Sequence, residues 1–183
     1  SHLSFTSHGP LGVAAATAPD LRTAIDVLLR YTEIRAPYVW LTGEPGADYF
    51  IIRAVEAVDL GPVRQLLVET MFLAIQSIVA GILGRNLAGA QLELAYSAPP
   101  YDAALRRAFD GDLKFDGEGH YLRLPASWLD ESCALFDDQL HRAATSRCRE
   151  LLRRVTGESD IEVAVRAELL AARGKMPKLD VVA

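Results

Sequence analysis

Residues 38–55 read YVWLTGEPGADYFIIRAV, two apolar runs on either side of the turn-forming residues Gly43-Glu44-Pro45-Gly46. Proline fixes one turn angle and glycine tolerates backbone conformations that other residues avoid, so this quartet favours a tight turn. The flanking runs, Tyr38–Thr42 and Asp48–Val55, are rich in the β-branched and aromatic residues that favour strands. The stretch therefore predicts a β-hairpin.

Helical periodicity appears on both sides of this hairpin. Upstream, Asp20 can cap a helix whose apolar residues recur every three or four positions until Pro37 ends it. Downstream, Gly61-Pro62 can begin a long helix that runs to about Ile82 and is stopped by Gly84. This second helix is apolar on most of its circumference, so we expect it to be covered on several sides.

The segment after the long helix alternates short strands and a short helix. Residues 91–97 alternate apolar and polar side chains, the period of a half-buried strand, and residues 101–109 have the pattern of an amphipathic helix. Residues 113–115 and 121–124 favour two more strands, which turn at Gly117-Glu118-Gly119. The order of these elements predicts a mixed α+β fold, in which a small sheet of hairpins is covered by helices.

Both ends of the sequence depart from this pattern. Residues 1–16 mix polar, glycine, proline and small apolar residues, which favours a loop or a sheet edge. From Ala134 onward an apolar helical stripe is interleaved with arginines. We therefore divide the chain into a first domain over residues 1–133, a helical linker region over residues 134–174, and the start of another folded unit over residues 175–183.

Composition and charge narrow the classes of function. The chain is 50% apolar and 23% charged, which is enough for one folded domain, and its net charge of -5 would repel a nucleic-acid backbone. No secretory signal is present, and the longest apolar run, Leu66–Leu83, contains Glu69 and Gln76, which are costly in lipid. We expect a cytoplasmic protein without a membrane span.

The residues that could react are scattered along the chain. Cys133 and Cys148 show no metal-ligand spacing, so we expect two buried, reduced thiols. Asp137-Asp138 and His141 could orient a base or bind a metal within one helical turn, but a solvated helix face explains them better. Neither a nucleophile elbow nor a glycine-rich nucleotide loop is present. We therefore expect no enzyme, no metal site and no cofactor.

One set of aromatic and apolar side chains between the hairpin and the long helix could line a cavity for a small ligand. Arg53 or His120 would offer the few polar contacts that orient a ligand in such a cavity. An ordinary filled core accounts for the same residues equally well. The candidate effector-binding residues are Tyr38, Trp40, Phe50, Arg53, Met71, Phe72, Tyr96 and His120.

The sequence also resembles a known family. Gly9–Ile25, GPLGVAAATAPDLRTAI, followed by Leu29-Arg30-Tyr31, resembles the GxLGxAxxxSPTLxxAL…LxRY stretch of AraC/XylS-type transcriptional regulators. Residues 92–100 are similar to the family's VxFxHxxP pattern, and residues 165–183 to its entry into the helix-turn-helix domain. The resemblance is to the arabinose-binding-type sensing domain of a group that includes ornithine-responsive and virulence regulators. Two positions depart from it, since the family prefers Ser at position 18 and often has His at position 96.

The resemblance implies the effector-sensing and dimerisation domain of a bacterial DNA-binding regulator that forms a homodimer. A small-molecule effector, an apolar or fatty-acid-like compound being one candidate, would change how a pair of helix-turn-helix modules, absent from this chain, meets DNA. It also implies that an N-terminal piece precedes the GxLG stretch. The long apolar helix and the stripe Leu140–Leu152 are the candidate dimer contacts. The alternatives are an effector-free dimerisation module and a small-molecule enzyme.

Overall fold

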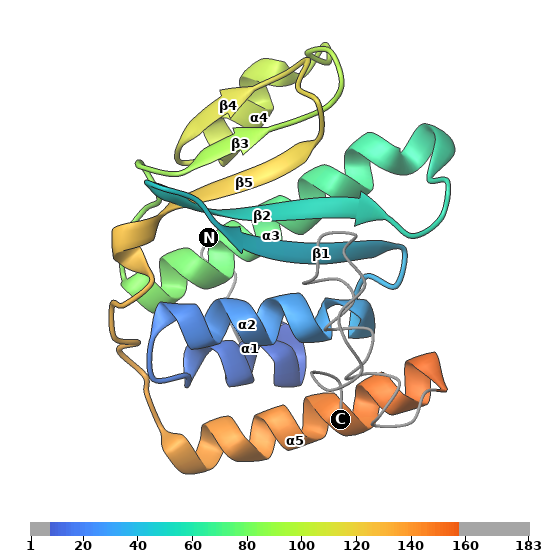
Figure 1. Ribbon diagram of the computed structural model, residues 1–183. Coiled ribbons are helices and arrows are strands. Elements are labelled where there is room, and N and C mark those ends of the chain that lie inside the picture. The colour runs from blue at the N-terminus through green and yellow to red at the C-terminus, as the bar shows by residue number, and fades with distance from the viewer. Residues whose placement is uncertain (1–7, 158–183) are drawn as a thin grey trace.

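The computed structural model describes residues 8–157, in which a five-stranded sheet packs against helices (Figure 1). Figure 1 shows α3 running behind the sheet, while α2, α1 and α5 follow one another below strand β1. The helices are α1 (Gly9–Ala16), α2 (Leu21–Tyr31), α3 (Arg64–Leu83), α4 (Asp102–Ala108) and α5 (Asp138–Thr156). The strands are β1 (Val39–Pro45), β2 (Tyr49–Glu56), β3 (Gln91–Glu93), β4 (Asp112–Lys114) and β5 (His120–Pro125). The predicted mixed α+β class is confirmed.

Strands β1 and β2 form the predicted hairpin, but its turn is shifted. Strand β1 continues through Gly43 to Pro45, which pairs with Phe50. Gly46 then closes the turn by donating its amide to the Tyr49 carbonyl at 2.8 Å, so the turn begins where the predicted one ends. Gly43 is needed for packing instead, because a Cβ at this position would lie 2.6 Å from the Phe50 ring.

The predicted hairpin between β4 and β5 was wrong. The sheet order is β1-β2-β5-β3-β4, so β3 lies between these two strands and pairs parallel with β4 and antiparallel with β5. Leu92 of β3 stands opposite both Leu113 and Leu122, and all three side chains are buried. The turn after β4 bonds to the chain beyond β3, because Asp116, at φ 59°, donates its amide to the Tyr96 carbonyl at 3.0 Å.

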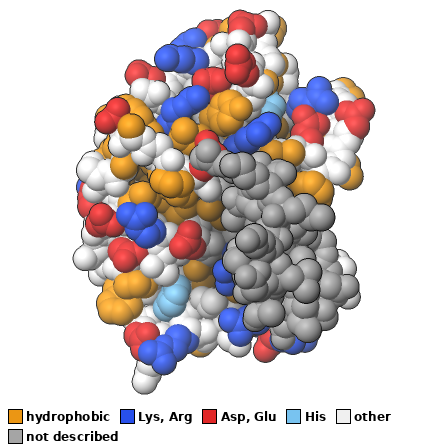
Figure 2. Space-filling view, in the orientation of Figure 1, with side chains coloured by type: hydrophobic (Ala, Val, Ile, Leu, Met, Phe, Trp, Pro, Cys, Tyr) orange, Lys and Arg blue, Asp and Glu red, His pale blue; other side chains and the backbone are white. Residues whose placement is uncertain are grey.

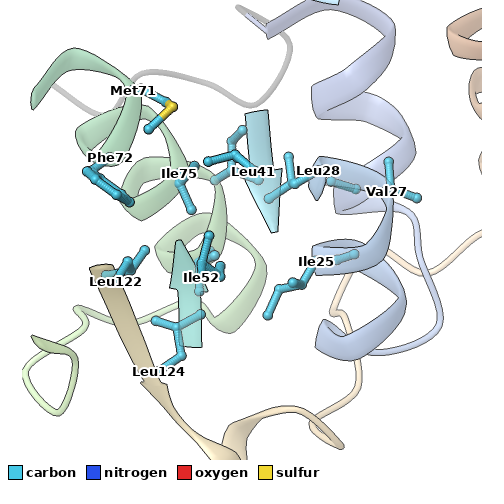
Figure 3. Close-up of a cluster of buried hydrophobic side chains, with 14 of the residues drawn as sticks. Ile25, Val27, Leu28, Leu41, Ile52, Met71, Phe72, Ile75, Leu122 and Leu124 are labelled. Carbon is cyan, nitrogen blue, oxygen red and sulfur yellow. The ribbon is translucent and has the colours of Figure 1, made fainter. Parts of the chain in front are cut away.

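The hydrophobic core lies between one face of the sheet and helices α2 and α3. Figure 3 shows the core side chains pointing toward one another: Ile25 and Leu28 from α2, Met71, Phe72 and Ile75 from α3, and Leu41, Ile52, Leu122 and Leu124 from the strands. Phe72, Leu122 and Leu124 have no exposed surface. Each such side chain stabilises the fold by roughly 1.5–3 kcal/mol relative to full exposure.

Helix α3 matches its sequence prediction at both ends. A short 3₁₀ turn at Gly61–Val63 leads into it, and Gly84 ends it in the left-handed conformation at φ 65°, which glycine adopts without strain. The segment Gly61–Leu83 is long and apolar enough to cross a membrane by composition, and half of it is buried within the protein. Burial beneath the sheet is the behaviour of a core helix.

Helix α1 replaces the loop or sheet edge that the sequence predicted for this region, and that prediction was wrong for residues 9–16. A proline in the first turn starts the helix, and alanine favours its continuation. Ala14, Ala15 and Ala16 are buried, at 0%, 0% and 2% exposure. Their small side chains allow α1 to pack closely against α2, α3 and α5.

Helix α5 packs along α1 with a narrow apolar stripe. Ala144, Cys148 and Leu152 are buried in the shared core, whereas Leu140 is 47% exposed. The helix ends at the predicted stop, Gly157, which is left-handed at φ 67°. The remainder of the predicted linker region and the segment 175–183 lie outside the described residues, and the division at residue 133 stays a prediction.

The segment that leads into α5 is held against the corner between α1 and α2. Four backbone hydrogen bonds of 2.9–3.2 Å join the two segments: Leu21 to Glu131, Arg22 to Leu129, Cys133 to Pro19, and Asp137 to Thr17, each amide named first. An ion pair of 2.8 Å between Arg22 and Asp130 adds to them at the surface. The start of α5 is thereby fixed to the N-terminal helices.

Candidate functional site

The predicted effector-binding residues do not converge on one site. Alternation along the strands places Phe50 and His120 on the core face of the sheet, and Trp40 and Arg53 on the opposite face. Tyr38 precedes β1 and packs against the core. Their role in binding an effector stays a prediction.

Two of the predicted residues, Met71 and Phe72, lie in the filled core. Met71 is 7% exposed and Phe72 is fully buried. Figure 3 shows both side chains on α3, among the other apolar side chains that join this helix to the sheet. These two residues therefore pack in an ordinary filled core, the alternative to a cavity that the sequence left open.

A buried carboxylate on α3 marks the polar part of this region. Glu69 is 7% exposed, and its Oε1 accepts hydrogen bonds from the hydroxyls of Tyr96 at 2.7 Å and Tyr101 at 3.2 Å. Tyr96 follows β3, and Tyr101 immediately precedes α4. We call Glu69, Tyr96, Tyr101 and the neighbouring His120 the Glu69 cluster. It joins α3, the end of β3, the start of α4 and the start of β5.

His120 is the histidine of this cluster and is held in its neutral form. Its Nδ1 accepts a hydrogen bond from the Ala95 amide at 3.3 Å, and only an unprotonated Nδ1 can do so. Burial lowers the pKa of His120, the Glu56 carboxylate partly opposes this, and the Arg64 guanidinium reinforces it. The imidazole ring lies 5.8 Å from the Tyr96 ring, centre to centre.

The two phenols of the cluster act as fixed hydrogen-bond donors. Burial first, and then the hydrogen bond to the Glu69 carboxylate, raise the pKa of Tyr96 far above its ordinary value. Burial and Glu69 also raise the pKa of Tyr101. Both hydroxyls therefore stay protonated at neutral pH and donate to Glu69 Oε1.

A second polar contact ties the same helix to the other end of α4. The buried Gln76 side chain donates Nε2 to the Ala108 carbonyl at 2.8 Å and accepts the Asp110 amide on Oε1 at 2.9 Å. Helix α4 is thus linked to α3 through Glu69 at its beginning and through Gln76 at its end. Neither role was predicted from the sequence, although two polar residues inside an otherwise apolar helix are the signal that could have revealed them.

The opposite face of the sheet carries arginines around one aromatic ring. The guanidinium groups of Arg53 and Arg123 lie 5.9 Å and 5.2 Å from the centre of the Tyr121 ring, and Arg123 forms an ion pair of 2.9 Å with Glu93. Figure 2 shows acidic and basic side chains interspersed over the visible part of the described surface. No single sign of charge dominates that view.

The other candidate reactive groups have structural partners. Asp137 caps α5 by accepting the Leu140 amide at 2.9 Å, Asp138 pairs with Arg142, and His141 Nδ1 lies 2.8 Å from the Ala14 carbonyl oxygen. Within residues 8–157, no group of three or more His, Cys, Asp or Glu side chains is arranged to hold a metal ion.

Both cysteines are buried free thiols, as predicted. Burial raises the pKa of Cys133 to about 11, with Asp20 adding to it, and burial alone raises the pKa of Cys148 to about 11. Both thiols are therefore shielded from solvent.

The chain belongs to the family of N-terminal arabinose-binding domains of AraC transcription regulators, whose family model matches residues 1–133. The matched range contains the whole sheet and the Glu69 cluster. The family resemblance predicted from the sequence is thereby confirmed, and the chain is a regulatory domain of this class.

Two individual proteins are similar to the chain. The ornithine utilization regulator of Pseudomonas aeruginosa is 25% identical over 178 residues, which cover 97% of this chain and 52% of that protein. The crystal structure of the transcriptional regulator CdpR from Pseudomonas aeruginosa has the same fold, with a TM-score of 0.61 at 16% identity, over 98% of this chain and 59% of that one. The chain spans about half the length of the curated relative that it matches.

Proposed function

We propose that the chain is the part of a cytoplasmic AraC-type regulator that binds a small-molecule effector, and that the Glu69 cluster is the polar part of the effector site. The observation that carries this proposal is the burial of Glu69 beside two phenols in an otherwise apolar core. Removing an ionised carboxylate from water is costly, and neutral hydroxyls offset only part of that cost. A buried carboxylate of this kind contributes more to the binding of a ligand than to the folding stability of a core.

The residues predicted from the sequence extend this site. Tyr96 and His120 belong to the Glu69 cluster, and Phe72 lies one turn after Glu69 on the same side of α3. In this proposal the half-buried Phe50 supplies an apolar contact on the core face, whereas Met71 and Phe72, which lie in the filled core, pack behind the site. Trp40 and Arg53 would contact an effector only from the other side of the sheet, so they define a separate, second candidate surface.

For this domain to regulate transcription, effector binding must change the DNA-binding part of the whole regulator. Helix α4 begins and ends on polar contacts with α3, so a ligand that displaces the Tyr101 hydroxyl from Glu69 would remove one of its two anchors. We also propose that the whole regulator pairs as a homodimer. The stripe Leu140–Leu152 packs largely against α1, which leaves the exposed residues Val63 and Leu66 beside the start of α3 as the better candidate contact.

A thermal-shift screen with a matched pair of variants tests the sensing proposal. The unmodified chain, Glu69→Gln and the surface control Glu118→Gln are each heated with a panel of metabolites, and Glu118 is exposed. A true effector raises the melting temperature of the unmodified chain and of the control, because ligands that bind only the folded state stabilise it. The same compound should shift Glu69→Gln less.

The outcomes of this screen separate the alternatives. A panel that leaves the melting temperature unchanged would favour the effector-free dimerisation module over the sensor. A compound that stabilises the chain and is recovered unchanged by mass spectrometry supports sensing. A compound that is converted to a product would favour the enzyme alternative and overturn the proposal.

A further inference from the structure

The buried Glu69 carboxyl group forms no ion pair in the described part of the chain. The ion pairs among residues 8–157 do not include it. The guanidinium of Arg64, at the start of the same helix, is bound by Glu56 at 2.5 Å and Asp59 at 3.2 Å. The hydrogen bonds to Glu69 come from the phenols of Tyr96 and Tyr101. A cation bound at Oε1 would therefore supply the charged partner that the described residues do not.

The side chains around Glu69 suit an organic cation. Tyr96 and Tyr101 reach the carboxylate through their hydroxyls, and the Phe115 ring, 6.2 Å from the Tyr96 ring, already faces the Arg106 guanidinium at 5.3 Å. Aromatic rings attract ammonium groups through their negative faces, and this attraction grows when water is excluded. Neutral His120 adds no repulsion to an incoming cation.

Tyr101 is the more exposed of the two phenols that bind Glu69. Its side chain is 45% exposed, and its hydrogen bond to Glu69 is the longer of the two, at 3.2 Å against 2.7 Å for Tyr96. A primary ammonium can take the place of the Tyr101 hydroxyl on Oε1 and form a stronger, charge-assisted hydrogen bond. The hydrogen bond from the Tyr96 hydroxyl to Glu69 can remain in place.

We propose that the effector is a primary amine whose ammonium group binds Glu69 Oε1 between the rings of Tyr96 and Tyr101. This inference rests on the proposed sensing function and names the chemical class of the ligand. It disfavours the fatty-acid-like effector considered from the sequence, because a ligand carboxylate would be repelled by the buried Glu69 carboxylate. Release of the Tyr101 hydroxyl frees the beginning of α4, while Gln76 still holds its end.

Three probes of equal chain length test the ligand class: hexylamine, 1-hexanol and hexanoate. Each is titrated into the full 183-residue chain at neutral pH and constant ionic strength, and binding is followed by melting temperature and by the NMR signals of the tyrosine rings. Hexylamine should raise the melting temperature with saturation and shift the ring signals of Tyr101. Hexanol and hexanoate should do neither at the same concentrations.

Two variants and one control test the site. Glu69→Gln keeps the shape and removes the charge, and it should weaken hexylamine binding roughly tenfold to hundredfold, the loss expected for one charge-assisted hydrogen bond. Tyr101→Phe removes the competing hydroxyl and keeps the ring, so it should bind hexylamine at least as tightly as the unmodified chain. Glu118→Gln, an exposed acid, should leave the affinity unchanged.

The results that overturn the inference are distinct from those that overturn the sensing function. Equal binding of hexylamine by Glu69→Gln, loss of binding in Tyr101→Phe, or preference for hexanoate would refute the amine site. If another metabolite stabilises the chain while amines do not, the sensing proposal stands and the amine inference falls. If neither the amines nor the metabolite panel binds, both fall.

Discussion

At the scale of single residues, His120 gives the protein a dependence of stability on pH. Burial lowers its pKa below the ordinary value of 6.5, so the unfolded chain binds a proton that the folded chain excludes. The free energy of unfolding should therefore fall as the pH drops through 6.5 toward the folded pKa. His120→Asn, whose Oδ1 can still accept the Ala95 amide, should flatten this fall. Urea unfolding at neutral and mildly acidic pH measures both slopes.

His8 provides the comparison for this experiment. Burial and the Arg35 guanidinium lower the pKa of His8 as well. His8 therefore also lowers the free energy of unfolding as the pH becomes acidic. A protein in which both histidines are replaced by Asn should show a flatter profile than either single variant. If His120→Asn kept the unmodified slope, a neutral, buried His120 would be ruled out.

The cysteines are expected to be inert in the folded protein. A thiol reacts as its thiolate, and pKa values of about 11 for Cys133 and Cys148 leave very little thiolate at pH 8. Ellman's reagent should therefore label neither residue in the native chain and both after unfolding in urea. Fast labelling of the native chain at either position would show that this thiol is not buried.

At the scale of elements, the pairing of β3 with β4 depends on a glycine. A Cβ on Gly111, just before β4, would lie 2.1 Å from the Ala90 carbonyl oxygen, so the backbone would have to move. Gly111→Ala should lower the free energy of unfolding by about 1–3 kcal/mol. Gly81→Ala is the matched control, because nothing lies within 4 Å of a Cβ there, and it should raise stability by roughly 0.5–1 kcal/mol. Chemical denaturation of both variants compares them directly, and equal effects would contradict the close contact at Gly111.

The elements that the sequence predicted well are those determined by nearby residues. The β1–β2 hairpin, the 3₁₀ turn from Gly61 that leads into α3, and the stop of α3 at Gly84 follow from turn and capping residues in or next to these elements. The parallel pairing of β3 and β4 was missed because it depends on a row of buried leucines from three separate strands. Helix α1 was missed because Gly9 and Pro10 suggested a loop, whereas its alanines are needed for packing against α5.

The candidate site was predicted only in part for the same reason. From the sequence, Tyr96 was predicted to be part of the aromatic lining of a cavity, and His120 one of its two possible polar contacts. Glu69 was seen only as a residue unsuited to a membrane, since its importance depends on Tyr101, 32 residues away along the chain. A buried charge is recognised by its surroundings in space, and those surroundings are absent from any local pattern.

At the scale of the whole molecule, the charge of the chain argues against direct contact with DNA. The net charge is -5, and acidic and basic side chains alternate over the visible surface in Figure 2. Because affinity for DNA depends on Lys and Arg that replace counterions, we expect no shift of promoter DNA by this chain at about 150 mM salt. An electrophoretic mobility assay tests this, and tight binding would show a basic surface outside the described residues.

The attachment of α5 to the α1–α2 corner has a mechanical consequence. The helix is 19 residues long, so its far end lies about 28 Å from the point where the backbone bonds hold it. A tilt of about 5° at that pivot would swing the far end by roughly 2.5 Å. Because α5 also packs along α1 through Ala144, Cys148 and Leu152, the two helices tilt together, and a small rotation of the N-terminal helices becomes a larger displacement near Gly157.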